Sequence, residues 1–217
     1  MAILDSLLMV AVVSIWGILV INLVLTLAGY TWYLRHVKRP EPELPEIPPF
    51  VSILVPAHNE EIVIVKTVLS LLSFDYPHDR YEVIIINDNS SDHSADKLAA
   101  LQHEFTTDRL KVINTDSVTG GKGKSNALNI GLKQARGSII SVYDADNTPE
   151  APALRILVAE LLANDRQAAV IGKFRTRNKN ASLLTRFINI ETLSFQWMAQ
   201  AGRQQLFHLC TILEQTT

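Results

Sequence analysis

The chain has 217 residues, of which 47% are hydrophobic and 19% are charged, and its formal net charge at pH 7 is −2. This balance is too apolar for a disordered chain and indicates a globular part together with a membrane part. No basic block stands out, which argues against a nucleic-acid partner, and the single cysteine, Cys210, excludes a disulfide framework within the chain.

A long apolar stretch lies near the N-terminus, where residues 6–34 carry no charged side chain. A spanning helix needs about 20 mostly apolar residues, so the stretch predicts one transmembrane helix within residues 1–36. A cleaved signal peptide fits less well, because no Lys or Arg precedes the run and no A-x-A site follows it. Three basic residues come next: Arg35, Lys38 and Arg39. The positive-inside rule then predicts an inner or plasma membrane protein with its N-terminus outside and the remainder in the cytoplasm.

Residues 37–49 hold five of the nine prolines. Proline removes backbone donors and favours extended geometry, so this segment is predicted to be a semi-rigid spacer. A soluble domain is expected to begin at about Phe50 and to continue to residue 180.

Beyond Phe50, short apolar runs alternate with amphipathic segments of helical length. Strands are predicted at 51–55, 83–86, about 109–116, 138–143 and about 168–178. Helices are predicted at about 63–72, 93–105, 125–134 and 149–164. This alternation predicts an α/β fold, a Rossmann-like, doubly wound sheet of mostly parallel strands.

Acidic and polar side chains follow several of these strands, at Asn59, Glu60, Asp88, Asp144 and Asp146. In parallel sheets, ligands bind beyond the carboxyl ends of the strands. On an extended segment Asp144 and Asp146 would point the same way and could hold Mg²⁺ or Mn²⁺ together with a nucleotide diphosphate. The alternative is a solvated acidic turn.

The loop GGKGKS, residues 120–125, resembles part of a phosphate-binding loop. The P-loop pattern requires a glycine where this chain has Val118. The glycines would still let the backbone approach a ligand, and Lys122 and Lys124 bring positive charge. A solvated loop and a membrane-tethered, P-loop-like NTPase that uses Lys124 remain alternatives.

Residues 181–205 form a candidate amphipathic helix. Its apolar stripe fits either a helix that faces a protein core or a helix that lies in a membrane interface.

Four segments in order, VPAHNEE, INDNSSD, GGKGKSNALN and YDADN, resemble the family 2 glycosyltransferases. The likeness is greatest to the membrane-embedded processive synthases of poly-N-acetylglucosamine, hyaluronan, chitin or cellulose. It implies a nucleotide-sugar-binding fold and an inverting hexosyltransferase that uses a UDP-sugar, with UDP-N-acetylglucosamine as our guess. It also implies Mg²⁺ or Mn²⁺, a growing polysaccharide as acceptor, and a lipid bilayer around the enzyme.

The resemblance assigns roles to the base and ribose side of the site. Pro56, Ala57 and Glu60 would line the uridine pocket, and Asp88 would contact uracil or ribose. Asn87 stands where the family usually has the first acid of a pair.

The resemblance also assigns the diphosphate side. Lys122 or Lys124 would approach the uracil or the diphosphate. Asp144 would bind the ribose and metal region, and Asp146 would bind the metal that bridges the phosphates as part of a D-x-D motif.

The family's acceptor segment should begin near residues 209–212, and the tail at 206–217 does not supply it. The general base and the Q-x-x-R-W motif are not found either. We therefore expect a truncated form that keeps the donor- and metal-binding half and transfers no sugar. A non-catalytic remnant or binding module is the further alternative.

Overall fold

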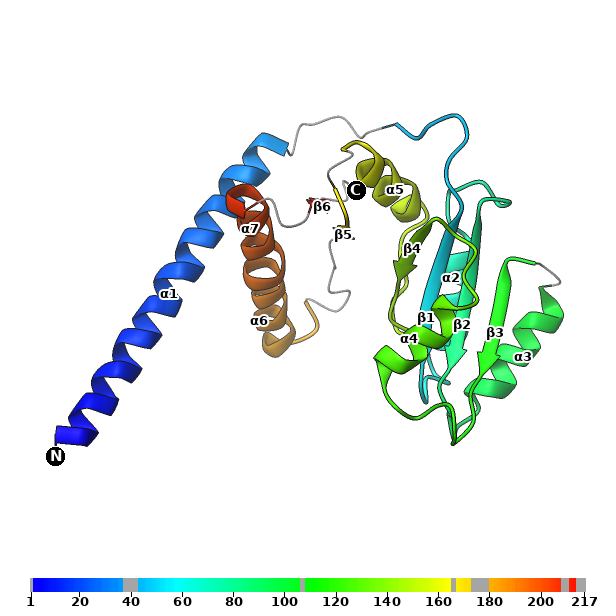
Figure 1. The fold of residues 1–217 in the computed structure, drawn as a ribbon, viewed down its shortest axis with the longest axis horizontal. Helices are drawn as coiled ribbons and strands as arrows, with labels where there is room; N and C mark the ends of the chain where they lie inside the picture. The colour runs from blue at the N-terminus through cyan, green and yellow to red at the C-terminus, as the bar shows by residue number, and fades with distance from the viewer. Residues whose placement is uncertain are drawn as a thin grey trace. The chain divides into compact units, whose positions relative to one another are not determined.

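The computed structural model describes residues 2–36, 43–105, 108–164, 167–172, 180–207 and 211–213. Two compact units divide the chain (Figure 1), and the boundary between them falls within helix α5 (Ala153–Leu162). The first is Leu44–Arg155, and the second joins Met1–Glu43 to Ile156–Thr217.

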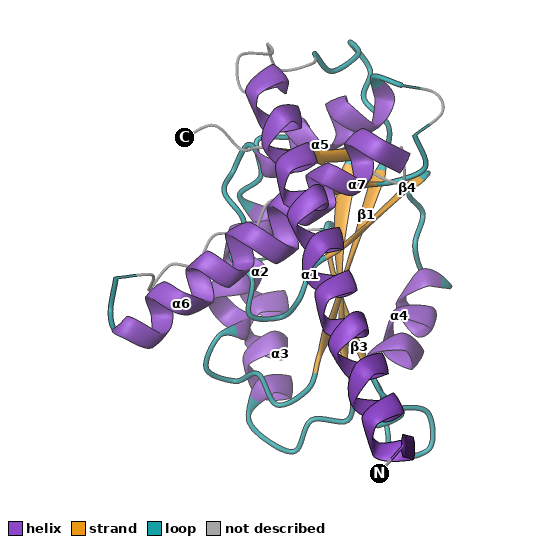
Figure 2. Ribbon diagram, turned by 90° about the vertical axis from the view of Figure 1, so that its left-hand side faces the viewer, coloured by secondary structure: helices purple, strands orange, loops and turns teal. Residues whose placement is uncertain are grey.

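The unit Leu44–Arg155 is built on a four-stranded parallel sheet in the order β3-β2-β1-β4. Its strands are β1 (Val51–Ala57), β2 (Tyr81–Asn87), β3 (Leu110–Asn114) and β4 (Ile139–Val142). Its helices are α2 (Ile64–Leu72), α3 (Ser94–Glu104) and α4 (Lys124–Leu132). Figure 2 shows α4 on one face of the sheet and α2 and α3 on the other. The predicted α/β, doubly wound parallel fold is therefore confirmed.

The burial of the two central strands explains their apolar sequences. Every residue of β2 is buried, and β1 is buried except at Pro56. A strand that is covered on both faces reads as an unbroken apolar run, because neither face meets water. On the α4 face, Leu54, Ile84 and Ile86 pack around Ala127.

The strand order also fixes where a ligand can bind. β2 and β3 lie on one side of β1, while β4 pairs with β1 on the other side. Successive strands are thus added outward on one side of β1 and then on its other side, although all four run parallel. The switch point of this order lies between β1 and β4. In open parallel sheets such a switch point leaves a crevice at the carboxyl ends of the strands.

At the amino ends of the strands, opposite the crevice, Glu82 of β2 is a buried carboxylate with its side chain fully enclosed. Its Oε2 lies 2.8 Å from Lys111 Nζ and 3.1 Å from Arg136 Nε, and its Oε1 accepts a 2.7 Å hydrogen bond from Ser52 Oγ. Burial alone would raise the pKa of Glu82, but these hydrogen bonds outweigh it and hold the pKa below the ordinary glutamate value.

Glu82 should make the stability of this unit depend on acid. Because the folded pKa is lowered, its contribution is fully present above the unfolded pKa of about 4.5 and is lost as pH falls through the folded pKa. We expect Glu82→Gln to cost about 2 kcal/mol at pH 7 and to flatten this acid dependence. Urea unfolding followed by circular dichroism at pH 3–7 measures both, with the exposed Glu104→Gln as control. An unchanged pH dependence in Glu82→Gln would contradict this account.

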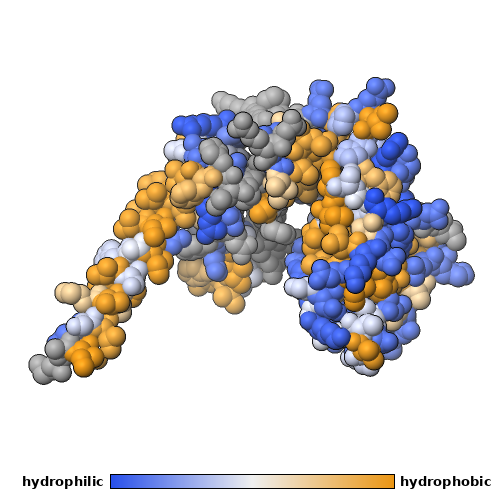
Figure 3. All heavy atoms as spheres, viewed as in Figure 1, coloured by the Kyte–Doolittle hydropathy of each residue, from blue (hydrophilic) through white to orange (hydrophobic). Residues whose placement is uncertain are grey.

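The second unit begins with α1 (Ala2–His36), whose surface is apolar along its length (Figure 3). Among the described residues it is the one helix whose length and composition suit a membrane span. The basic residues Lys38 and Arg39, used above to predict orientation, and residues 37–42 of the predicted spacer lie outside the described ranges.

The last predicted strand is shorter than expected and joins another partner. β5 (Val170–Gly172) pairs in parallel with β6 (Thr211–Leu213) in a second, two-stranded sheet. The remainder of the prediction, residues 173–178, lies outside the described part of the chain.

The predicted amphipathic helix is three consecutive helical segments. These are α6 (Leu183–Glu191), the π-helix η1 (Thr192–Met198) and α7 (Ala199–Phe207). A capping box between Ser182 and Thr185 starts α6. A π segment has more residues per turn than an α-helix, so it changes which face of the following helix points inward.

The segments of this helix differ in how they pack. Helix α6 leaves its apolar side chains exposed: Leu183, Leu184, Phe187, Ile188 and Ile190. Helix α7 instead packs on α1 at a crossing of small residues. A Cβ on Gly29 would lie 2.0 Å from Met198 O, and a Cβ on Gly202 would lie 1.9 Å from Leu25 O. Such backbone contact is typical of helices that pair within a membrane.

Candidate functional site

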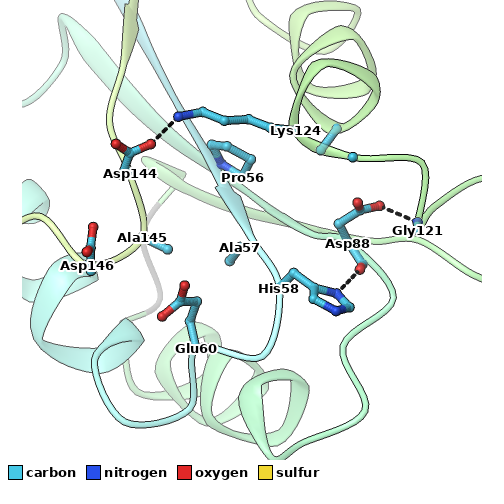
Figure 4. Close-up of a pocket in the computed structure, with 12 residues that line it drawn as sticks. Pro56, Ala57, His58, Glu60, Asp88, Gly121, Lys124, Asp144, Ala145 and Asp146 are labelled. Atoms are coloured by element: carbon cyan, nitrogen blue, oxygen red, sulfur yellow. Dashed lines mark hydrogen bonds and ion pairs between the residues drawn. The ribbon is translucent and has the colours of Figure 1, made fainter.

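A cavity of about 490 Å³ opens at the carboxyl ends of β1, β2 and β4 (Figure 4). It lies at the switch point of the sheet, where the fold predicts a ligand. Its walls are Pro56, Ala57, His58, Glu60, Asp88, Gly121, Gly123, Lys124, Ala127, Asp144, Ala145 and Asp146.

Separate strands thus bring the predicted site residues to one cavity. All of them except Lys122 line it. Lys122 is exposed and is not among the lining residues, so of the two lysines named above Lys124 is the one that lies at the cavity. Asp88 and Asp146, which are far apart in the sequence, border the same space.

Asp88 is buried, with 5% of its surface exposed, and is held at several atoms. Its backbone N–H donates to Ala57 O at 2.7 Å, and its carbonyl oxygen lies 2.7 Å from His58 Nδ1. Its carboxylate Oδ1 accepts from Gly121 N–H at 2.9 Å and from Thr115 Oγ1 at 3.1 Å. The carboxylate is therefore fixed before any ligand arrives.

The loops after β1 and β2 are fastened to each other by reciprocal hydrogen bonds. Asn59, in the left-handed conformation with φ 57°, accepts from Ser91 N–H at 2.8 Å and donates its own N–H to Ser90 Oγ at 3.0 Å. One residue on, Glu60 N–H donates to Ser94 Oγ at 2.9 Å. The polar residues of these two motifs therefore largely bind one another, which orders the rim of the cavity.

The acidic segment after β4 is a turn, which is the alternative to an extended segment that the sequence left open. β4 ends at Val142, and Asn147 N–H donates to Asp144 O at 3.1 Å. Hydrogen bonding to β1 continues to Tyr143, the predicted end of the strand, whose N–H donates to Leu54 O at 3.1 Å. Helix α2 holds this turn instead: Thr67 Oγ1 donates to Ala145 O at 2.6 Å.

The two aspartates therefore face different partners, as Figure 4 shows. Asp144 forms an ion pair with Lys124, the first residue of α4, and both side chains are about half exposed. Gly123, at φ 91°, caps this helix, and the first turn of α4 lies against the cavity. Lys124 and the positive end of the helix dipole together favour an anion at this end of the site.

Asp146 and Glu60 form the more acidic end of the cavity. Burial raises the pKa of Glu60 above its ordinary value, and the charge of Asp146 and then that of Asp92 raise it further, while His58 opposes them. A region where carboxylates repel one another in this way is one that a cation would stabilise.

The donor set fits a divalent cation that a ligand completes. Within the described ranges, no three His, Cys, Asp or Glu side chains gather closely enough to hold a metal alone. Mg²⁺ is commonly bound through one or two carboxylates, with water and phosphate oxygens filling its remaining positions. Asp144 and Asp146 can supply the protein's share of such a shell.

Sequence reasoning did not single out several residues that shape this site. Thr67 and Thr115 hold the acidic turn and Asp88, and His58 fixes the backbone beside them. One signal was available for Thr67, because it is a polar residue on the apolar face of α2 and is fully buried. Thr115 carries no comparable signal, since it lies in a loop rich in turn-forming residues.

Comparisons with known proteins agree with this architecture. The model of the family described as Glycosyl transferase family 2 matches residues 52–212. The probable glycosyltransferase YdaM of Bacillus subtilis (strain 168) is 43% identical over 211 residues, 96% of this chain and 50% of that protein. The poly-beta-1,6-N-acetyl-D-glucosamine synthase of Staphylococcus epidermidis is 35% identical over 146 residues, 66% of this chain and 33% of that protein. The chain thus spans half or less of the length of these relatives.

A solved structure has a similar fold. It is the mannosyltransferase PcManGT from Pyrobaculum calidifontis, in complex with GDP-Man and Mn²⁺. The TM-score is 0.56 at 27% sequence identity, over 74% of this chain and 48% of that one.

Proposed function

This chain belongs to glycosyl transferase family 2, and on that premise we propose that its cavity binds a nucleoside-diphosphate sugar together with a divalent cation. The observation that carries the proposal is the convergence of Asp88, Lys124, Asp144 and Asp146 on one cavity at the switch point of the sheet. The donor is a UDP-sugar, by the motifs that resemble the polysaccharide synthases. UDP-N-acetylglucosamine is the first candidate, because one relative is named as a synthase of poly-beta-1,6-N-acetyl-D-glucosamine.

In this proposal, different cavity residues contact different parts of the ligand. Pro56 and Ala57 form the wall against the nucleoside, and Asp88 accepts a hydrogen bond from its base or ribose. Lys124 and the first turn of α4 hold the diphosphate, which carries more charge as the sugar leaves. Asp144 and Asp146 hold Mg²⁺ or Mn²⁺, which when bound offsets that same charge.

We further propose that the protein is anchored in a membrane. α1 spans the bilayer with its N-terminus outside, and the spacer at 37–49 leads to a cytoplasmic glycosyltransferase domain at 50–180. The exposed apolar side chains of α6 then rest at the membrane surface, within the segment 181–205. Extension of a polysaccharide is the reaction we propose for the whole enzyme.

Calorimetry on the full chain in detergent micelles tests the donor site. We expect UDP-N-acetylglucosamine to bind in the presence of Mn²⁺ and to bind more weakly after EDTA treatment. Asp146→Ala should reduce the affinity toward the metal-free level, because a single carboxylate, that of Asp144, then remains to hold the cation. The exposed Asp79→Ala serves as the control, and MgATP and GDP-mannose serve as competing ligands.

Three results would argue against this proposal. The first is that wild type releases no heat with any sugar nucleotide. The second is an unchanged affinity in Asp146→Ala. The third is a preference for MgATP, which would favour the NTPase alternative.

A further inference from the structure

Thr115 and the glycines that follow it surround one oxygen of Asp88. In the parallel register of β2 and β3, Asn87 lies beside Asn114, so the next residues, Asp88 and Thr115, leave the sheet as neighbours. Thr115 then lies 3.1 Å from Asp88 Oδ1, and Gly121 N–H donates to the same oxygen at 2.9 Å.

Gly120 makes this arrangement sterically possible. A Cβ at this position would lie 1.9 Å from Thr115 Oγ1 and 2.7 Å from Asp88 Oδ1. Any side chain there would push the threonine and the carboxylate apart. The closeness of Thr115 and Asp88 is therefore sufficient to explain the first glycine of the loop.

The Thr115 hydroxyl has one proton and two acceptors within reach. Asp88 Oδ1 lies at 3.1 Å and Asn87 O at 3.3 Å. The carboxylate is the nearer acceptor and the charged one, and hydrogen bonds to ionised acceptors are the stronger class. Donation to Asp88 is therefore favoured.

Resting on the proposed function, we infer that Thr115 is a positioning residue for the nucleoside. It and Gly121 N–H occupy Asp88 Oδ1, so that Oδ2 is presented to the cavity as an acceptor in a fixed orientation. The ligand group that Oδ2 accepts from is an N–H of the base or a hydroxyl of the ribose. This preorganisation spares the ligand the cost of ordering a buried carboxylate.

Thr115→Val removes the hydroxyl while keeping the shape of the side chain. We expect it to weaken UDP binding in the presence of Mn²⁺ about five- to tenfold, less than the full worth of a hydrogen bond to a charged group, because the hydroxyl acts on the ligand only through Asp88. Binding of Mn²⁺ alone and of inorganic pyrophosphate with Mn²⁺ should not change, because neither reaches Asp88. Thr115→Ser should restore UDP binding. Calorimetry of the full chain in detergent, with melting curves, measures each value.

Thr119→Val is the matched control within the same loop. Thr119 Oγ1 donates to Asp116 Oδ1 at 2.7 Å, whereas Thr115 Oγ1 lies beside Asp88 Oδ1. If Thr119→Val weakens UDP binding as much as Thr115→Val, loop order and not Asp88 orientation is responsible, and the inference is overturned. Should Thr115→Val lower the melting temperature strongly, Thr115→Ala replaces it with the same expectations.

Two further outcomes separate this inference from the proposed function. If wild type does not bind UDP, the proposed function fails. If wild type binds UDP and Thr115→Val binds it equally well, or loses pyrophosphate in parallel, only the inference fails. Repeating the titrations with 2′,3′-dideoxy-UDP identifies the contact: a persistent penalty in Thr115→Val assigns it to the base, and a lost penalty assigns it to the ribose.

Discussion

Asp88→Asn is expected to lower the affinity for UDP about a hundredfold in the presence of Mn²⁺, the upper end of the range for a hydrogen bond to a charged group. The substitution preserves shape, and the amide oxygen can still accept from Gly121 N–H and Thr115. The amide NH₂ then takes the place of Oδ2 and faces a ligand donor with a second donor. Both groups lose a partner in a buried position, which costs more than removing the interaction from solvent.

Calorimetric titration with UDP and with pyrophosphate measures this effect. Pyrophosphate binding should stay within about twofold of wild type, because Asp88 is assigned to the nucleoside and not to the phosphates. Asp96→Asn is the control, since the Asp96 side chain is largely exposed and pairs with His93 outside the cavity. Equal losses for both ligands would show that Asp88 supports the whole site and would refute its assignment to the nucleoside.

The parallel sheet was predictable because strands that are buried on both faces have unbroken apolar sequences. β1 and β2 are enclosed on both faces, so their apolar runs identified them, and the polar residue after each run marked the edge where a ligand binds. Convergence of Asp88, Asp144 and Asp146 followed from this edge, whereas Lys124 was assigned from the family resemblance. The fold rule alone was enough to place these three aspartates together.

Other features depend on contacts that no local pattern records. The turn at Asp144–Asp146 is held by Thr67 of α2, so the sequence left an extended segment and a turn open there. The glycine-rich loop was considered for phosphate contact, and its sequence gave no sign that Gly120 and Gly121 also lie against Asp88. The amphipathic pattern at 181–205 predicted one helix and gave no sign of the π segment η1. This segment separates α6, whose apolar side chains are exposed, from α7, which packs on α1.

The helix crossing suggests why that π segment lies where it does. α6 begins with a stable cap and exposes its apolar side chains, whereas α7 brings Gly202 against the backbone of α1 at Leu25. A continuous α-helix would carry the α6 stripe onward at the same angle. The wider turn of η1 allows one stretch of chain to offer one face outward and then close-pack on α1.

Lys124→Ala is expected to change two affinities in opposite directions. Its ammonium group pairs with Asp144 in the absence of ligand and so occupies a carboxylate that the cation would use. Removing it should strengthen binding of Mn²⁺ alone about two- to fivefold, since an ion pair this exposed is worth little. UDP with Mn²⁺ should bind about thirtyfold more weakly, because the diphosphate loses a charge-assisted hydrogen bond.

Lys122→Ala is the matched control for this prediction. Lys122 lies two residues away in the same loop, is exposed and does not line the cavity, so both affinities should stay within about twofold of wild type. Calorimetry with Mn²⁺ and then with UDP separates the two steps. A parallel fall of both affinities in Lys124→Ala would mean that the lysine organises the site as a whole. The opposite signs are expected only if the same ammonium group passes from Asp144 to the phosphate when the nucleotide and its cation bind.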